Sequence, residues 1–491
     1  MVGVPGRSKG CSTCRKRKKG CDKVRPTCTQ CSNAGLKCGG YQRDIVFLNH
    51  TQDTKAVPVV YRKEPPERSG HLHGGITDIA LPNGLAQTAY IEKYISIFLM
   101  KYLPEGRCLT ANGLGPSRDW IEIAHELHTS DKAIQLSLLS LGLFAAGQSQ
   151  YAIQSYCLAL RNLQTTLSVP VRAQNDSTLA TCQLLSLFEI FHGADENLLL
   201  QGRKWRTHLS GLLAFIQARS PSAYQSGVSH QLFADGRYPL LIAAIKERRR
   251  FPLNTLEWRT TPWEKEPKSC MDKLFDIMAD LCEILASTDE MRCCDDPVQK
   301  ANLHAEVLRA CQDLEESLQS WLKEAGPLTV FRDSNGIAIN PTSPSDIILA
   351  HMTVLYWTIY IVLYSTLISI HGPQLSEVSA DIDPAPYIRS VANALPYFWS
   401  RGAGMCGANL AASPWGLCLH IIYGSPYSYP EETALLEEFA MQQSFMQQNG
   451  AFAVLQFLDS LQRSTAGAEL ANIDGREGMV LRARNWMTGR R

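Results

Sequence analysis

Six of the sixteen cysteines lie close together near the start of the chain. They are Cys11, Cys14, Cys21, Cys28, Cys31 and Cys38, in the spacing C-x2-C-x6-C-x6-C-x2-C-x6-C. The spacing is an internal repeat, because adding 17 to each of the first three positions gives the last three. A segment this short cannot bury enough apolar surface to fold on its own. The cysteines must therefore supply most of the folding free energy, through disulfides or a metal.

Metal binding explains the number of cysteines better than disulfides do. Zn²⁺ prefers four tetrahedral ligands and binds thiolates well. One zinc ion would leave two cysteines unused, and two zinc ions need eight ligand positions, which six thiolates fill only if two of them bridge both metals. Three disulfides are typical of secreted domains, but the chain does not start with an apolar secretory signal. We therefore expect two Zn²⁺ held by all six cysteines.

Charge is distributed unevenly along the chain, although the net charge is only +1. Residues 1–43 hold eleven Lys and Arg against a single acid, Asp22, whereas the rest holds 37 basic and 46 acidic residues. This distribution predicts a polyanion partner for the basic head alone. Five basic residues directly follow the second cysteine: Arg15, Lys16, Arg17, Lys18 and Lys19. We expect a short helix here, whose C-terminal end reads a G-rich triplet in the DNA major groove.

The stretch GCSTCRKRKKGCDKVRPTCTQCSNAGLKCGGYQRD resembles the DNA-binding module of fungal Zn2Cys6 (zinc binuclear cluster) transcription factors. All six cysteines match, as do the basic run and Pro26 before the fourth cysteine. The resemblance implies that Cys11 and Cys28 bridge the two zinc ions. It also implies that Lys18 reads a CGG-type triplet, assisted by Arg17.

The other basic residues of the head are expected to contact phosphate, which adds affinity and salt dependence but no sequence information. The residues expected in this role are Arg7, Lys9, Arg15, Lys16, Lys19, Lys23 and Arg25. The sequence departs from the family at Gly20, where a further basic residue is common. Either one phosphate contact is missing, or the turn needs the conformational freedom of glycine.

Composition divides the chain into five segments: a basic tail (1–10), the zinc cluster (11–43), a linker rich in Pro, Gly and charge (44–84), a helical body (85–462) and a frayed C-terminal tail (463–491). The body shows apolar stripes at helical spacing. They run through Ile134, Leu138, Leu141 and Ala145 after a cap at Ser130; through Ile153, Tyr156, Leu160, Leu163 and Leu167 before Pro170; through Trp205, Leu209, Leu212 and Ile216; through Leu274, Met278, Leu281 and Leu285; and through Leu303, Val307, Ala310, Leu314 and Trp321. We predict an all-α body of helices packed in antiparallel pairs.

Residues 263–285 and 394–424 resemble the fungal-specific regulatory domain of the same family, which supports this architecture and implies a regulatory role. One stretch, residues 347–370, lacks Asp, Glu, Lys and Arg and is long enough to cross a bilayer. It contains His351 and several Ser and Thr, and we find no second span. We therefore favour a buried central helix and expect no membrane partner.

Three other patterns in the body each have two interpretations. The acids Glu431, Glu432, Glu437 and Glu438 interleave with Leu435, Leu436 and Phe439, as in an acidic activation segment or, as we favour, a solvated amphipathic helix. Trp357, Tyr360 and Tyr364 would line an effector pocket or, as their spacing favours, pack in the core. His125 and His128 are one place too close for the zinc motif H-E-x-x-H, so we expect no zinc site there.

Together these features predict a nuclear, sequence-specific regulator of RNA polymerase II genes that is not an enzyme. Its expected partners are double-stranded DNA and the transcription machinery or coactivators, and the resemblance implies control of a metabolic pathway or a biosynthetic gene cluster. The linker shows no run of apolar heptads and contains Pro58, Pro65, Pro66 and Pro82. Binding as a monomer and homodimerisation through the helical body both stay open.

Two alternatives belong to other classes of protein. The first is an enzyme with a zinc-bound targeting module, which would require a pocket with strongly shifted pKa values in the body. The second is a zinc-dependent RNA or protein adaptor, which would prefer single-stranded RNA over duplex DNA.

Overall fold

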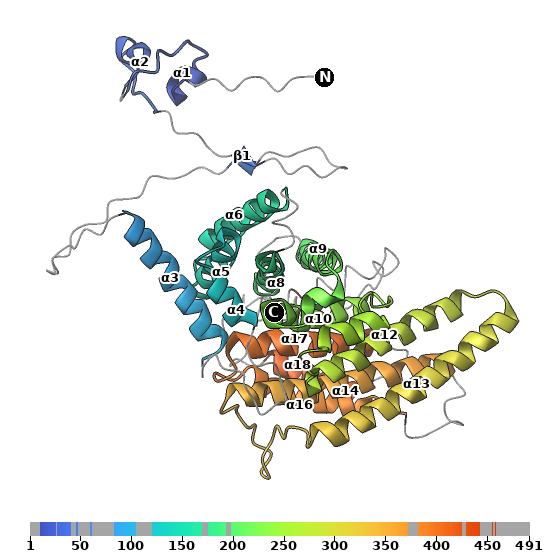
Figure 1. Cartoon of the computed structure of the whole chain (residues 1–491). Coiled ribbons are helices and arrows are strands. Elements are labelled where there is room, and N and C mark those ends of the chain that lie inside the picture. Colours follow the sequence, from blue (N-terminus) through green and yellow to red (C-terminus); the bar gives the residue numbers. More distant parts are fainter. Residues whose placement is uncertain are drawn as a thin grey trace. The chain divides into compact units, whose positions relative to one another are not determined.

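The computed structural model describes residues 10–25, 27–40, 46–47, 59–60, 83–104, 120–168, 175–192, 198–371, 382–424 and 429–441, together with Val454 and Phe457. The chain forms two compact units, Met1–Ala80 and Leu81–Arg491 (Figure 1).

The described residues of the first unit form two short helices and one small strand pair. The helices are α1 (Ser12–Lys16) and α2 (Thr29–Asn33). The strands β1 (Val46–Phe47) and β2 (Val59–Val60) pair antiparallel, with Val46 opposite Val60 and Phe47 opposite Val59. The buried apolar cluster of this unit consists of cysteines. Metal ligands therefore take the place of an aliphatic core.

The second unit is built from helices, and its described residues contain no β-strand beyond one isolated bridge between Arg332 and Ala338. Its α-helices are α3 (Asn83–Tyr102), α4 (Trp120–Leu127), α5 (Lys132–Ala145), α6 (Ser149–Leu167), α8 (Asp176–Phe191), α9 (Leu198–Gln217), α10 (Gly227–Lys246), α11 (Leu256–Thr260), α12 (Cys270–Cys293), α13 (Pro297–Ala325), α14 (Pro344–His371), α16 (Ala385–Phe398), α17 (Gly404–Gly424) and α18 (Pro430–Met441). Two short 3-10 helices, η1 (Pro221–Tyr224) and η2 (Thr261–Trp263), join them. The predicted all-α architecture is confirmed.

Helices that follow one another in sequence pack against one another. The main pairs are α5 with α6, α8 with α9, and α12 with α13. The last pair forms a long hairpin (Figure 1). The connection within each pair is short. The apolar stripe of one helix therefore packs against the helix that follows it in sequence.

Capping explains where two of these helices begin. The predicted cap of α5, Ser130, is wrong, because Asp131 occupies that position and its carboxylate accepts hydrogen bonds from the backbone N–H groups of Ala133 and Ile134. The Ser130 hydroxyl instead donates to the Leu127 carbonyl at the end of α4. Helix α12 begins with a capping box between Ser269 and Asp272.

Most predicted stripes face the core, and one is shifted. All four stripe residues of α9 and of α12 are buried. On α6, however, Ile153 and Leu167 are exposed, whereas the small residues Ala152, Ser155 and Ala159 are buried. Small side chains let α5 and α6 approach closely, so the packed face of α6 follows side-chain size as well as hydrophobicity.

Helix α14 runs through the core, as predicted for residues 347–370. Of its most apolar 18-residue window, 89% is buried inside the protein. The prediction that no second segment of this kind exists is wrong, because α17 is also long and apolar enough to cross a membrane, and 67% of its window is buried. Side chains of neighbouring helices cover much of both helices, as expected for apolar helices in the core of a helical domain.

Candidate metal centre and nucleic-acid interface

The six clustered cysteines form two overlapping groups of four. Within each group the Sγ atoms lie within 4.8 Å of one another, and the groups are Cys11, Cys14, Cys21 and Cys28, and Cys11, Cys28, Cys31 and Cys38. Two residues, Cys11 and Cys28, belong to both groups. They are the two residues that the family resemblance assigns as bridging ligands.

The distances between sulfurs suit tetrahedral zinc. Cys11 Sγ lies 3.7 Å from the Sγ atoms of both Cys28 and Cys31, and Cys14 Sγ lies 3.6 Å from Cys28 Sγ. A Zn–S bond of about 2.3 Å and a tetrahedral angle place two sulfur ligands about 3.8 Å apart. A disulfide would hold them about 2.05 Å apart. The donor set and its spacing therefore fit two zinc ions and exclude three disulfides.

The repeat in the sequence is also a structural repeat. Helices α1 and α2 begin at equivalent positions of its two halves, one residue after Cys11 and one residue after Cys28. In the first half the Cys14 N–H donates to Cys11 Sγ at 3.3 Å, and in the second half the Cys31 N–H donates to Cys28 Sγ at 3.4 Å. Each central sulfur thus accepts an amide N–H from the first turn of its own helix, which offsets part of the negative charge of the thiolates.

Both short helices end in the same backbone motif. The Lys19 N–H donates to the Cys14 carbonyl at 3.0 Å, and at the equivalent place in the second half the Leu36 N–H donates to the Cys31 carbonyl at 2.9 Å. The residue directly before this N–H donor has a left-handed backbone in each half: Lys18 with φ 53° and Gly35 with φ 63°. Glycine is the usual residue at this position.

A second pair of positions shows the same contrast. Lys23 has φ 64°, and Gly40, its counterpart in the second half, has φ 73°. A left-handed conformation costs a residue with a Cβ about 1–2 kcal/mol. The first half therefore carries lysine at two positions where the second half carries the unstrained glycine. Backbone strain of this kind is a sign of functional side chains.

The end of the cluster segment is tied back to α1. The Ser12 N–H donates to the Gly40 carbonyl, the Ser12 hydroxyl to the Gly39 carbonyl, and the Thr13 hydroxyl to the Lys37 carbonyl, at 2.8–3.0 Å. A Cβ on Gly39 would lie 2.1 Å from Ser12 Oγ, so only glycine allows this approach. These hydrogen bonds fix α1 against residues 37–40, at the other end of the cluster segment.

Asp22, the single acid of residues 1–43, holds the second half in place. Its carboxylate accepts a hydrogen bond from the Thr29 N–H at 3.0 Å, at the start of α2. The hydrogen bonds from Thr29 lower the pKa of Asp22 below its usual value. The carboxylate is therefore charged and engaged at neutral pH.

Zinc is needed to ionise the buried sulfurs. Burial raises the pKa of the Cys14 thiol to about 12 and raises that of Cys28 as well. Burial favours the protonated thiol, whereas bound Zn²⁺ favours the thiolate, because a coordinating thiol loses its proton. Metal binding and folding of this unit are consequently coupled.

The predicted DNA-contacting side chains lie on the surface where the structure describes them. Lys16, Arg17, Lys18, Lys19 and Lys23 are all exposed. The side chain of Arg15, and Arg7, Lys9 and Pro26, lie outside the described residues. At Gly20 the conformational explanation is wrong, because its φ is not positive and a Cβ would meet nothing within 4 Å.

Comparison with known proteins agrees with this geometry. Residues 9–45 match the fungal Zn(2)-Cys(6) binuclear cluster domain, and residues 94–256 match the fungal specific transcription factor domain. The chain is thus similar to the fungal Zn2Cys6 transcription factors in two of its segments. The matched zinc-cluster domain binds two Zn²⁺.

A curated relative of this zinc-cluster protein is the transcriptional regulatory protein pro1 of Neurospora crassa. The two are 36% identical over 83 residues, which are 16% of this chain and 12% of the relative. The match thus spans about an eighth of the relative's length. No solved structure gives a significant match.

Helix α18 contains the acidic pattern of the helical domain. Leu436 and Phe439 are buried in the core, and Glu432 is buried and pairs with Arg389 at 2.7 Å. The segment is therefore an amphipathic helix, as favoured, because the rest of the domain covers its apolar face. The expectation that its acids are solvated holds for Glu431 and Glu438, which are exposed, but not for the buried Glu432.

The aromatic stripe of α14 is likewise core packing. Tyr360 is stacked on Tyr387 with ring centroids 4.7 Å apart, and the Tyr364 hydroxyl donates to the Glu315 carboxylate at 2.9 Å. Sequence reasoning missed that Glu92 on α3 lies beside His125 and His128. His128 Nε2 lies 2.9 Å from the Glu92 carboxylate, and a hydrogen bond between the two accounts for the arrangement.

Proposed function

We propose that the zinc-cluster domain reads a CGG-type triplet in the major groove, with Lys18 as the base-reading residue and Arg17 assisting. The observation that carries this proposal is the left-handed backbone of Lys18 at the end of α1. That conformation turns the chain away from the helix axis within the basic run, two residues after α1 ends. The end of the helix is then free to approach base edges, where lysine donates to guanine O6 and N7.

We assign Lys16, Lys19 and Lys23 to phosphate, together with Arg15, whose side chain lies outside the described residues. Their exposure and the excess of basic residues in the head support this role. Each contact with phosphate releases a counterion, so each should steepen the fall of affinity with salt by about 0.9 in a double-logarithmic plot.

The test is a binding selection with the zinc-loaded full-length chain. The chain is mixed with random duplex DNA at moderate salt, and the retained DNA is sequenced. Enrichment of CGG-like triplets supports the proposal, and single or regularly spaced paired triplets distinguish a monomer from a homodimer through the helical domain. Retention without any enriched sequence, with both zinc ions bound, would refute base reading and favour the RNA or protein adaptor.

We further propose that the protein acts in the nucleus on RNA polymerase II genes, with coactivators or the transcription machinery as partners, and that its targets belong to a metabolic pathway or a biosynthetic gene cluster. The two family domains support the first part, and the resemblance alone supports the second. Chromatin immunoprecipitation of a tagged chain from its native fungus would map the targets. Occupancy scattered over unrelated genes would contradict the gene-cluster role.

We propose a regulatory rather than catalytic helical domain. A pocket with strongly shifted pKa values would favour the enzyme alternative, and one cavity of this domain is lined by His351 and Lys246. Burial is the first cause of both shifts: it lowers the pKa of His351 to about 3 and that of Lys246 to about 8, the latter with a contribution from Arg206. A pKa shift caused mainly by burial is found in ligand-binding sites and in packed cores as well as in catalytic sites, so it does not by itself indicate catalysis.

A further inference from the structure

A cavity of about 170 Å³ lies within the helical domain, among α8, α9, α10, α12, α14 and α17. Most of its wall is apolar and includes Leu187, Ile242, Phe275 and Ile348. An apolar cavity of about 150 Å³ is large enough to hold benzene. The space therefore suits a molecule with a single six-membered ring.

Three side chains in this wall carry buried polar atoms without a hydrogen-bond partner in the described part of the chain. They are Gln183 through Oε1, Trp205 through Nε1 and His351 through Nε2. The three residues are only 4%, 3% and 3% exposed. Native interiors rarely leave such atoms unsatisfied, because each costs about 1–3 kcal/mol. A ligand with a polar group would satisfy them.

The structure fixes which end of the Gln183 amide is unpaired. Gln183 Nε2 donates to the Leu232 carbonyl at 2.7 Å, so the amide oxygen is the atom left over. A Cβ on Gly236 would lie 2.6 Å from this nitrogen, so glycine at 236 makes the approach possible. The hydrogen bond to α10 therefore fixes the orientation of the Gln183 amide oxygen.

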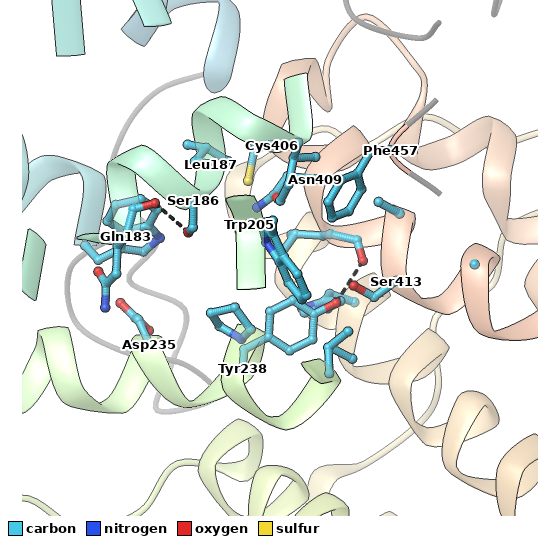
Figure 2. A pocket seen from close by; sticks show the side chains of 18 of the residues that line it. Gln183, Ser186, Leu187, Trp205, Asp235, Tyr238, Cys406, Asn409, Ser413 and Phe457 are labelled. Atoms are coloured by element: carbon cyan, nitrogen blue, oxygen red, sulfur yellow. Dashed lines mark hydrogen bonds between the residues drawn. The ribbon is translucent and has the colours of Figure 1, made fainter. Parts of the chain in front are cut away.

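The opposite wall is also braced. Pro414 lies inside α17 and has no N–H for the Leu410 carbonyl four residues earlier. The Tyr238 hydroxyl donates to that carbonyl at 3.3 Å, and the Tyr238 ring meets His351 edge-on at 4.8 Å. Figure 2 shows Trp205 and Tyr238 between Gln183 and Asp235 on one hand and Ser413 and Phe457 on the other. A wall held by such contacts is a preformed site.

The polar groups of the cavity favour a neutral occupant. His351 is uncharged at neutral pH because of its burial. An acidic residue, Asp235, and a basic residue, Lys246, also line the cavity. A hydroxyl group both donates and accepts, so it can meet the Gln183 oxygen or the Trp205 N–H.

We propose that this cavity is a ligand site for a neutral molecule with one ring and a hydroxyl group, recognised through Trp205 and Gln183. The site lies in the helical domain and does not depend on the DNA-binding proposal. Ligand that binds only the folded domain stabilises it by mass action, which makes the site a means of regulation by a metabolite of this class.

The test uses the full-length, zinc-loaded chain and two probes, 4-fluorophenol and 4-fluorotoluene, followed by ¹⁹F NMR titration. Both probes should bind, and the phenol more tightly. Trp205→Phe should weaken 4-fluorophenol about tenfold, the effect of one hydrogen bond, and leave 4-fluorotoluene unchanged. The matched control is Trp263→Phe, since Trp263 is buried but does not line the cavity; it should change neither affinity.

Ala412→Leu should fill the cavity and abolish binding of both probes, with folding checked by thermal melting. Undiminished binding to that folded variant would place the probes elsewhere and overturn the proposal. The same holds if the wild-type chain binds neither probe up to the solubility limit, or if Trp205→Phe and Trp263→Phe have equal effects on 4-fluorophenol. If Ala412→Leu does not fold, the comparison of the two tryptophan variants decides.

Discussion

Lys18 and Gly35 occupy equivalent positions in the two halves of the zinc cluster, and both have a left-handed backbone, with φ 53° and 63°. Lys18→Gly is therefore a cleaner probe than alanine, because it deletes the side chain and relieves strain at once. We expect the zinc-loaded variant to fold at least as stably as the wild type. Its preference for the triplet should fall by about 1–3 kcal/mol, measured by titration of matched and mismatched duplexes.

Lys23→Gly is the matched control for that variant, because Lys23 is also an exposed lysine with a positive φ. It removes the same charge and relieves the same kind of strain away from the end of α1. Affinity should fall equally for all duplexes, and the salt slope should fall by about 0.9. If Lys18→Gly behaves in the same way as Lys23→Gly, Lys18 is a phosphate contact and not the base reader.

Cys28→Ala should remove a ligand of both zinc ions. We expect metal analysis to find fewer than two zinc ions per chain and the first unit to lose its structure. The helical domain, a separate compact unit, should keep its own melting transition. Cys293→Ala is the control, since Cys293 is an exposed cysteine outside the cluster and should leave two zinc ions bound. Two zinc ions retained by Cys28→Ala would contradict the shared-ligand geometry.

The ligands of the zinc centre were predictable from the number and spacing of the cysteines, whereas the assignment of Cys11 and Cys28 as the shared ligands came from the family resemblance. The number of ions and the two halves follow from positions 11 to 38. The left-handed backbones of Lys18 and Lys23 were not predictable, since lysine usually avoids that region and only tertiary contacts impose it. The repeat offered a signal in retrospect: Gly35 and Gly40 stand at the equivalent places.

Apolar periodicity predicted the helices of the body but could not reveal their unusual features. The shifted face of α6 depends on Ala152 and Ala159, whose small size matters only once α5 lies against them. The cavity brings Gln183 and Trp205, on the consecutive helices α8 and α9, together with His351 on the distant helix α14. A linear pattern identifies which residues are apolar, whereas a cavity depends on how several helices fail to fill the space between them.

The helical domain should lose stability on acidification. Burial lowers the pKa of His351 to about 3, whereas an unfolded histidine titrates near ~6.5. The unfolded chain then binds the extra proton, so stability is lost as pH falls below the unfolded pKa. For this residue the loss from pH 7 to pH 5 is about 2 kcal/mol. His351→Leu should flatten the dependence of the melting temperature on pH, and an unchanged slope would contradict a neutral, buried His351.

Arg237 and Arg250 both form ion pairs but differ in burial, so we expect the pairs to contribute differently to the free energy of unfolding. Arg237 is 5% exposed and donates to Asp272 at 2.7 Å and to Asp276 at 3.0 Å, linking α10 to α12. Arg250 also pairs with two carboxylates but is 51% exposed. Arg237→Ala leaves two largely buried acids without their main partner and should cost about 3–5 kcal/mol. Arg250→Ala should cost less than about 1 kcal/mol, because water screens its pairs.

Urea unfolding of the zinc-loaded full-length chain, followed by circular dichroism, measures both costs, since nearly all of the helix lies in the second unit. Lys268 also contacts Asp276 and would compensate part of the charge in Arg237→Ala. The double variant Arg237→Ala with Lys268→Ala should therefore be less stable than the sum of the single effects predicts. Equal losses for Arg237→Ala and Arg250→Ala would show that α10 and α12 are held together by their apolar contacts, with the buried network contributing nothing beyond a surface pair.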